Sequence, residues 1–149
     1  MKQSLKKSYM YMIENSIWTK MFRNNFFVSK WKEIDVLKDW ADACAYFVSS
    51  ILKIFGLIKN IHATVDGTVK NILKYWWEET IWKGIQIWDI LVWEEINGHK
   101  HIWFYIWNDK AVSNSSAKKQ IIKHSLDYNN KRKIEKVYTN SKISEDEKI

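Results

Sequence analysis

Residues 85–107, IQIWDILVWEEINGHKHIWFYIW, predict a pair of β-strands and decide the fold class. Two short runs rich in β-branched and aromatic residues flank the pair Asn97-Gly98. An Asn-Gly pair between two such runs is a strong signal for a tight hairpin turn, because both residues tolerate positive φ. We therefore expect an antiparallel hairpin in which His101 begins the second strand.

More strands follow the hairpin along the chain. The run KAVSNSS (110–116) comes after an Asn108-Asp109 turn, and KQIIKHSL (119–126) and RKIEKVYT (132–139) are further strand candidates. The residues before the hairpin are mostly helical in pattern, although residues 24–37 are compatible with a short strand pair. Helices followed by an antiparallel sheet define the α+β class.

The helical pattern is clearest after Asp42. Cys44, Val48 and Ile51 recur at steps of three and four, and Gly56 is a suitable C-terminal stop. We also expect helices over residues 2–15 and 65–75. The predicted organisation is a helix and irregular lead-in over 1–41, one domain over 42–140 and a disordered charged tail over 141–149.

The composition of the 149-residue chain narrows the possible functions. A lone cysteine cannot form an internal disulfide, and the four histidines lack the clustered spacing of a zinc site, so we expect no metal and no cofactor. No apolar run reaches the roughly 18 residues of a membrane span. Glu14 and Asn15 interrupt the only N-terminal stretch that resembles a signal peptide. We expect a cytoplasmic protein, or one exported by a route that the sequence does not reveal.

The net charge of +7 would suit an anionic partner, but the charge is dispersed. In the densest basic cluster, residues 129–138, Glu135 and apolar residues separate the cations. A solvated strand face explains this pattern, so we do not expect a nucleic-acid partner.

The single cysteine, Cys44, has two readings. It lies on the apolar face of its helix, where free cysteine is commonly a core residue. It also lies in the first helical turn, after Asp42 as the expected N-cap, where free N–H groups and the helix dipole favour an anion. A thiol there can have a pKa well below its ordinary ~8.5 and act as a nucleophile, provided that a base is nearby.

The hairpin offers such a base. His101 begins the second strand, and pairing across the Asn108-Asp109 turn brings residues near 114–116 opposite it. Ser113 or Asn114 is then expected to accept the Nδ1–H of His101, which leaves Nε2 to face the sulfur. His99 lies on the same sheet face and is the competing base, whereas we read His62 and His124 as ordinary surface or structural histidines.

From Asp42 to Tyr138, about two-thirds of the chain, this order of motifs resembles the NlpC-type papain-like cysteine peptidases, a group of cell-wall endopeptidases and amidases. The family pattern has Cys at a helix start, Gly-Asp opening the first core strand, and His-x-Gly-x-Tyr-x-Gly on the second. The resemblance implies a papain-like fold with N-terminal helices packed on a small antiparallel sheet. It implies Cys44 as nucleophile, His101 as base, and a polar third group at Ser113 or Asn114.

Tryptophan stands where the family has glycine, at Trp88, Trp103 and Trp107. The chain has ten tryptophans and only four glycines. Since UGA specifies tryptophan in one variant genetic code and glycine in another, we hypothesise that several tryptophans are misread glycines: Trp18, Trp31, Trp40, Trp82, Trp88, Trp103 and Trp107. The alternative is an aromatic surface that binds cell wall or glycan.

Two functions follow. The first is hydrolysis of amide bonds in peptides, such as cell-wall stem peptides, through a Cys44 thioester. The second is a catalytically silent module that binds a polyanion or cell-wall polymer through basic and aromatic residues. Acyl transfer at the same site is a variant of the first.

Overall fold

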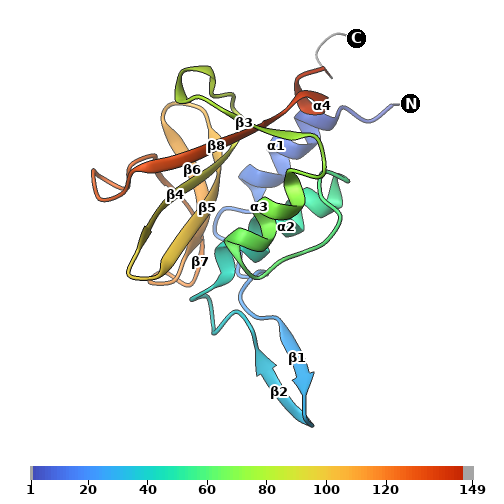
Figure 1. Cartoon of the computed structure of the whole chain (residues 1–149), viewed down its shortest axis with the longest axis vertical. Helices are drawn as coiled ribbons and strands as arrows, with labels where there is room; N and C mark the ends of the chain where they lie inside the picture. Colours follow the sequence, from blue (N-terminus) through green and yellow to red (C-terminus); the bar gives the residue numbers. More distant parts are fainter. Residues whose placement is uncertain (1, 146–149) are drawn as a thin grey trace.

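The computed structural model describes residues 2–145 and has the α+β architecture that the sequence predicts (Figure 1). Its helices are α1 (Leu5–Asn15), α2 (Ala43–Ile54), α3 (Val65–Ile72) and the short α4 (Ser141–Ser144). The three longer helices gather on one side of an antiparallel sheet.

The six strands of the sheet lie in the order β3-β8-β4-β5-β6-β7. Their bounds are β3 (Trp77–Thr80), β4 (Ile90–Ile96), β5 (His99–Ile106), β6 (Lys110–Ser115), β7 (Gln120–Ser125) and β8 (Ile134–Asn140). A separate hairpin of β1 (Phe26–Ser29) and β2 (Lys32–Asp35) projects away from the body of the molecule (Figure 1).

The hairpin expected around Asn97-Gly98 is confirmed. Asn97 and Gly98 have φ of 53° and 77°, and β4 and β5 pair in antiparallel register with Trp93 opposite His101. The turn at Asn108-Asp109 is also present, with positive φ at both residues.

Alternate side chains of β5 enter two different cores. Phe104 belongs to the larger core, which we call the helix-side core. Its ring packs against that of Phe47 of α2, with ring centroids 5.4 Å apart. Trp103 belongs to a smaller core on the opposite face, the far-side core, whose buried members are Leu91, Trp93, Trp103, Ala111, Leu126 and Val137. The period-two alternation of a strand therefore divides β5 cleanly between the two.

Helix α2 is held by its buried stripe. Phe47, Val48 and Ile51 are almost fully buried, as the spacing of three and four predicts. The helix ends at Ile54, and Gly56 follows with a φ of 66°, a conformation that glycine adopts without steric cost.

Some boundaries differ from the sequence prediction. Helix α3 ends at Ile72 rather than near Tyr75, and β3 lies between α3 and the main hairpin. The segment expected to be a tail begins with helix α4, whose Ile143 is buried, while residues 146–149 lie outside the described part of the chain. Within residues 2–145, no helix is both long and apolar enough to cross a bilayer.

Candidate functional site

Cys44 is the second residue of α2 and is 6% exposed. Its Sγ lies 4.0 Å from the carbonyl oxygen of Lys100 on β5. Packing of the helix start against this strand therefore brings the only thiol of the chain to the strand that carries His99 and His101.

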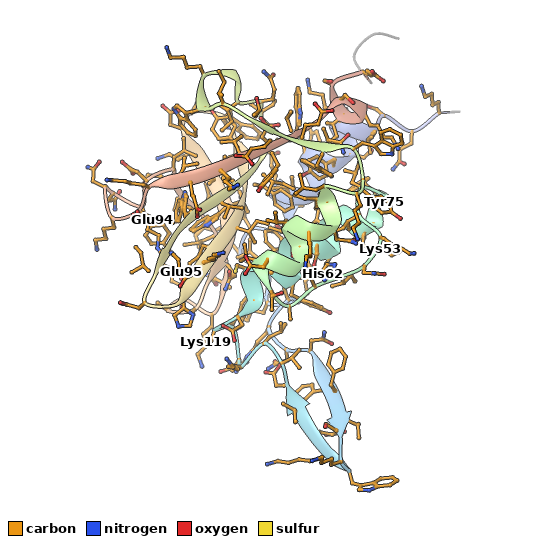
Figure 2. All side chains as sticks on the ribbon, viewed as in Figure 1. Lys53, His62, Tyr75, Glu94, Glu95 and Lys119 are labelled. Carbon is orange, nitrogen blue, oxygen red and sulfur yellow. The ribbon has the colours of Figure 1, made fainter. Side chains whose placement is uncertain are left out.

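Cys44, His99 and His101 line one cavity of about 510 Å³. Asp42 borders it at the helix start, and Glu95, labelled in Figure 2, borders it from β4. The other lining residues come from the loops before α2 and α3, from the start of α3, from the β4–β5 turn and from β5: Val36, Lys38, Ala41, Ala63, Thr64, Val65, Asp66, Gly98 and Lys100. Cys44 and both candidate bases therefore border one cavity, but Cys44 belongs to the helix-side core, whereas the side chain of His101 lies on the face of β5 that it shares with Trp103.

The expectation of a low thiol pKa is wrong for this structure. Burial raises the pKa of Cys44 to about 11, although the backbone N–H groups of Ile102, Ala45 and Cys44 itself act in the opposite direction. Asp42 occupies the N-cap position but makes no capping hydrogen bond with its side chain. Its carboxylate instead lies 2.7 Å from Lys38 Nζ, and its negative charge raises the thiol pKa further. Loss of water around the sulfur outweighs the helix terminus.

His101 is half-buried and uncharged at neutral pH. Burial lowers the pKa of His101 to about 4, with further lowering by the charges of Arg132 and His99 and a smaller opposite effect from Asp42. Its Nδ1 is buried and has no hydrogen-bond partner among residues 2–145. A neutral imidazole is able to take up a proton. The hydrogen-bond acceptor that we expected to orient the ring through Nδ1 is not in place.

The two candidates for that acceptor lie on opposite faces of β6. Asn114 lies two residues after Val112, a member of the helix-side core, and therefore on the same face of the strand. Its Nδ2 donates to the carbonyl oxygen of Trp40 at 3.0 Å. Ser113 lies two residues after Ala111, a member of the far-side core, and therefore on the face that His101 and Trp103 share. Its hydroxyl, however, donates to the carbonyl oxygen of Asn114 at 3.0 Å. The β5–β6 pairing ends at Phe104 and Val112, short of His101. Neither side chain therefore makes a hydrogen bond with His101 in this structure.

Sequence reasoning missed two neighbours of His101. These are His124 on β7 and Arg132 before β8: the charge of Arg132 lowers the pKa of His101, and His101 in turn lowers the pKa of His124. The sequence predicts an ordinary surface or structural histidine at His124, because it offers no partner comparable to those of His101. In the structure, His124 of β7 and Tyr128 of the β7–β8 loop both lie against Trp103 of β5, with ring centroids 3.6 and 5.4 Å apart. No local sequence signal predicts these contacts.

No group of three or more histidine, cysteine or acidic side chains within residues 2–145 has the arrangement of a metal site. No family model matches the chain, and no curated protein or solved structure is similar to it.

Proposed function

We propose that this chain is a cysteine hydrolase with an NlpC-type papain-like fold, and that it cleaves amide bonds in peptides such as cell-wall stem peptides. Cys44 is the nucleophile and His101 the base. The observation that supports this proposal best is that Cys44 and His101, which are far apart in the sequence, line the same cavity.

The raised thiol pKa and the lowered imidazole pKa define how the pair would work. With pKa values of about 11 and about 4, the resting site holds a neutral thiol and a neutral imidazole near pH 7. His101 then takes the thiol proton as Sγ attacks the substrate carbonyl, rather than before it. The N–H groups of Ile102 and Ala45, which lie toward the sulfur, are placed to receive the developing negative charge.

Collapse of the tetrahedral intermediate breaks the carbon–nitrogen bond. The protonated His101 donates its proton to the leaving amine and leaves a thioester on Cys44. Water then attacks the thioester while His101 accepts a proton from it, and the acid product leaves as the thiol is restored. Another amine in place of water would give acyl transfer with the same residues.

The test is digestion of purified cell-wall peptides, with products separated by mass spectrometry. Cys44→Ala is expected to abolish cleavage while circular dichroism shows a retained fold, and Ser49→Ala on the same helix is a matched control that keeps the sulfur. Full turnover by a folded Cys44→Ala variant would overturn the assignment of the nucleophile.

The buried thiol also favours a second function, a catalytically silent binding module. A thiol with a pKa of about 11 is almost entirely protonated at neutral pH. The net charge of +7 then becomes the main functional feature, and a polyanion is the partner that it suits. Steep loss of binding to an anionic cell-wall polymer with added salt, together with absent hydrolysis, would identify this function.

A further inference from the structure

The indole of Trp103 is packed more tightly than aromatic rings normally are. Its ring centroid lies 3.6 Å from that of His124 and 3.9 Å from that of Trp93, in tilted or edge-on orientations. Aromatic pairs in proteins usually have centroids about 4.5–7 Å apart. Residue 103 is therefore too large for the space between β5, β7 and the β7–β8 loop.

Unsatisfied polar atoms surround the same indole. Five buried side-chain nitrogens in this cluster have no hydrogen-bond partner among residues 2–145: His101 Nδ1, His124 Nε2, Arg132 Nη1, Trp93 Nε1 and Trp103 Nε1. Such atoms are rare in folded proteins, and each calls for a physical explanation. Four of these nitrogens belong to other residues and the fifth to the Trp103 indole itself, so the indole fills a region that is rich in polar atoms.

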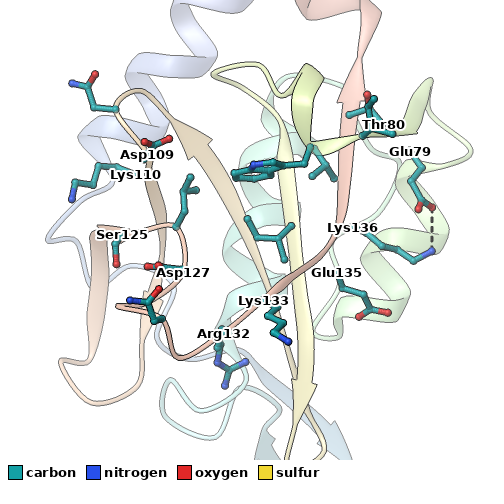
Figure 3. Close-up of a pocket in the computed structure, with 17 residues that line it drawn as sticks. Glu79, Thr80, Asp109, Lys110, Ser125, Asp127, Arg132, Lys133, Glu135 and Lys136 are labelled. Carbon is teal, nitrogen blue, oxygen red and sulfur yellow. Dashed lines mark hydrogen bonds and ion pairs between the residues drawn. The ribbon is translucent and has the colours of Figure 1, made fainter.

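Arg132 supplies a positive charge to this space. Its guanidinium carbon lies 6.0 Å from the centroid of Trp93, and its side chain makes no ion pair within residues 2–145. It also borders a second cavity, of about 1080 Å³, beside β8 (Figure 3). An unpaired guanidinium at the edge of a cavity is suited to hold a carboxylate.

We propose that the space filled by the Trp103 indole is a binding pocket for a carboxylate, and that it opens when residue 103 is glycine. Arg132 Nη1 and His101 Nδ1 donate hydrogen bonds to the carboxylate. His124 Nδ1 lies 2.6 Å from the carbonyl oxygen of Ser125, to which it donates, so Nε2 is left to accept a hydrogen bond from an amide N–H. A peptide carboxylate bound here would also orient His101, a role that neither Ser113 nor Asn114 performs.

The proposed pocket rests on the proposed function in one respect, namely that its carboxylate ligand is part of a peptide substrate. Binding itself is measured without catalysis, with acetate as the probe and ¹⁵N-labelled histidine as the reporter. In the Trp103→Gly variant, acetate is expected to shift the ring resonances of His101 and His124 saturably. Arg132→Gln in that background is expected to weaken the binding at least tenfold, and an equal concentration of chloride is expected to give no saturable shift.

Two results would overturn the pocket. One is a folded Trp103→Gly variant that gives no saturable shift with acetate, and the other is loss of folding in Trp103→Gly under conditions in which the parent chain is folded. Adding Cys44→Ala to Trp103→Gly is expected to leave acetate binding unchanged. Failure of acetate binding with Cys44-dependent hydrolysis intact would therefore reject the pocket and leave the proposed function standing.

A separate observation concerns the backbone at other tryptophans. Four of the ten have positive φ: Trp18 (74°), Trp31 (67°), Trp40 (83°) and Trp76 (68°). Positive φ is uncommon outside glycine, asparagine and aspartate, and it is an outlier for a bulky residue. Trp77, in contrast, is a buried strand residue whose Nε1 donates to the carbonyl oxygen of Leu57 at 2.9 Å.

Trp31 gives the clearest case. It is the second central residue of the two-residue turn between β1 and β2, since Ser29 pairs with Lys32, and Lys30 and Trp31 both have positive φ. This is the type I′ geometry, which favours glycine at that position. Trp31 is also 100% exposed, so no packing of its indole compensates for the backbone strain.

We infer that Trp18, Trp31, Trp40 and Trp76 are encoded by UGA and are glycine in the protein that the source organism makes. Trp31→Gly and Trp76→Gly are each expected to raise the folding equilibrium constant by about five- to thirtyfold, because the cost of a left-handed conformation disappears. Trp31→Ala keeps a Cβ at positive φ and is expected to raise the folding equilibrium constant much less than Trp31→Gly does.

Trp107→Gly is the matched control, since Trp107 is an exposed turn residue whose φ is not positive. Equal stabilisation by Trp31→Gly, Trp31→Ala and Trp107→Gly would overturn the inference, as would UGG codons at the four positions. UGA codons together with a gain confined to the left-handed positions would establish it.

Discussion

The two faces of β5 differ in how well their side chains fit. On the helix-side face, Phe104 meets Tyr9 and Phe47 edge to face, with ring centroids 5.7 and 5.4 Å apart, in the range that aromatic pairs prefer. The hydroxyl of Tyr9 donates to the carbonyl oxygen of Trp88 at 3.3 Å. On the far-side face, Trp103 is crowded against Trp93 and His124, and polar nitrogens are left without partners.

This difference concerns how well the side chains on each face pack. Interlocking apolar side chains define a unique core, and the rings around Phe104 pack in this way. Crowding combined with unsatisfied polar groups is poor for stability and is tolerated mainly where a site is needed. We therefore expect substitutions on the two faces of β5 to differ in their effect on stability.

The largest expected effect compares neighbours on the two faces. Phe104→Ala removes a fully buried ring from the helix-side core and is expected to lower the free energy of unfolding by about 3–5 kcal/mol. Trp103→Ala is expected to change it by less than about 1 kcal/mol, because relief of crowding offsets the lost burial. Urea denaturation of both variants measures this, and equal losses would remove the distinction between the faces.

The acid stability of the chain is expected to depend on the far-side face. Burial lowers the pKa of His101 to about 4 and that of His124 to about 3, below the ordinary 6.5 of the unfolded chain. The unfolded state therefore binds more protons between these values, and stability falls as pH decreases from about 6.5 toward 3. Melting temperatures across this range should show a smaller fall in His124→Gln, and an unchanged fall would contradict the assigned cause.

Asn114 provides a smaller test, because it lies on the helix-side face although we expected it beside His101. Asn114→Ala removes the hydrogen bond to the buried carbonyl group of Trp40 and is expected to cost about 1–3 kcal/mol of stability with little change in catalytic rate. Ser113→Ala, on the other face, is the comparison. A rate loss confined to the Asn114 variant would return Asn114 to the active site.

The smallest expected effect is on thiol chemistry near neutral pH. Because the pKa of Cys44 is about 11, its alkylation by iodoacetamide should be slow at pH 7 and rise with pH up to about 11. A rate that levels off near pH 7 would show that a thiolate is already present in the resting site. Denatured protein is the control for an ordinary thiol.

The sequence predicted the elements whose signals are local. The Asn97-Gly98 turn and the apolar spacing around Cys44 each depend on a few neighbouring residues, and both the β4–β5 hairpin and α2 are present. The position of β3 at the sheet edge, paired with β8 far along the chain, has no local signal.

The site was less predictable, for physical reasons. An uncertainty of one residue in strand register moves a side chain to the opposite face, which is why Ser113 and Asn114 were not distinguished. The thiol pKa depends on how much water surrounds Sγ, and the loops that bury it are distant in sequence. No local sequence signal predicts the approach of His124 and Arg132 to His101.

The most direct test of the central claim is a double-mutant cycle on hydrolysis of cell-wall peptides. If Cys44 and His101 act as one unit, Cys44→Ala, His101→Ala and the double variant should lose cleavage to nearly the same extent, as is typical of coupled catalytic residues. His99→Ala, which changes a histidine of the same cavity, should have a mild effect. Additive losses in the double variant, or loss of activity with His99→Ala but not with His101→Ala, would contradict the account.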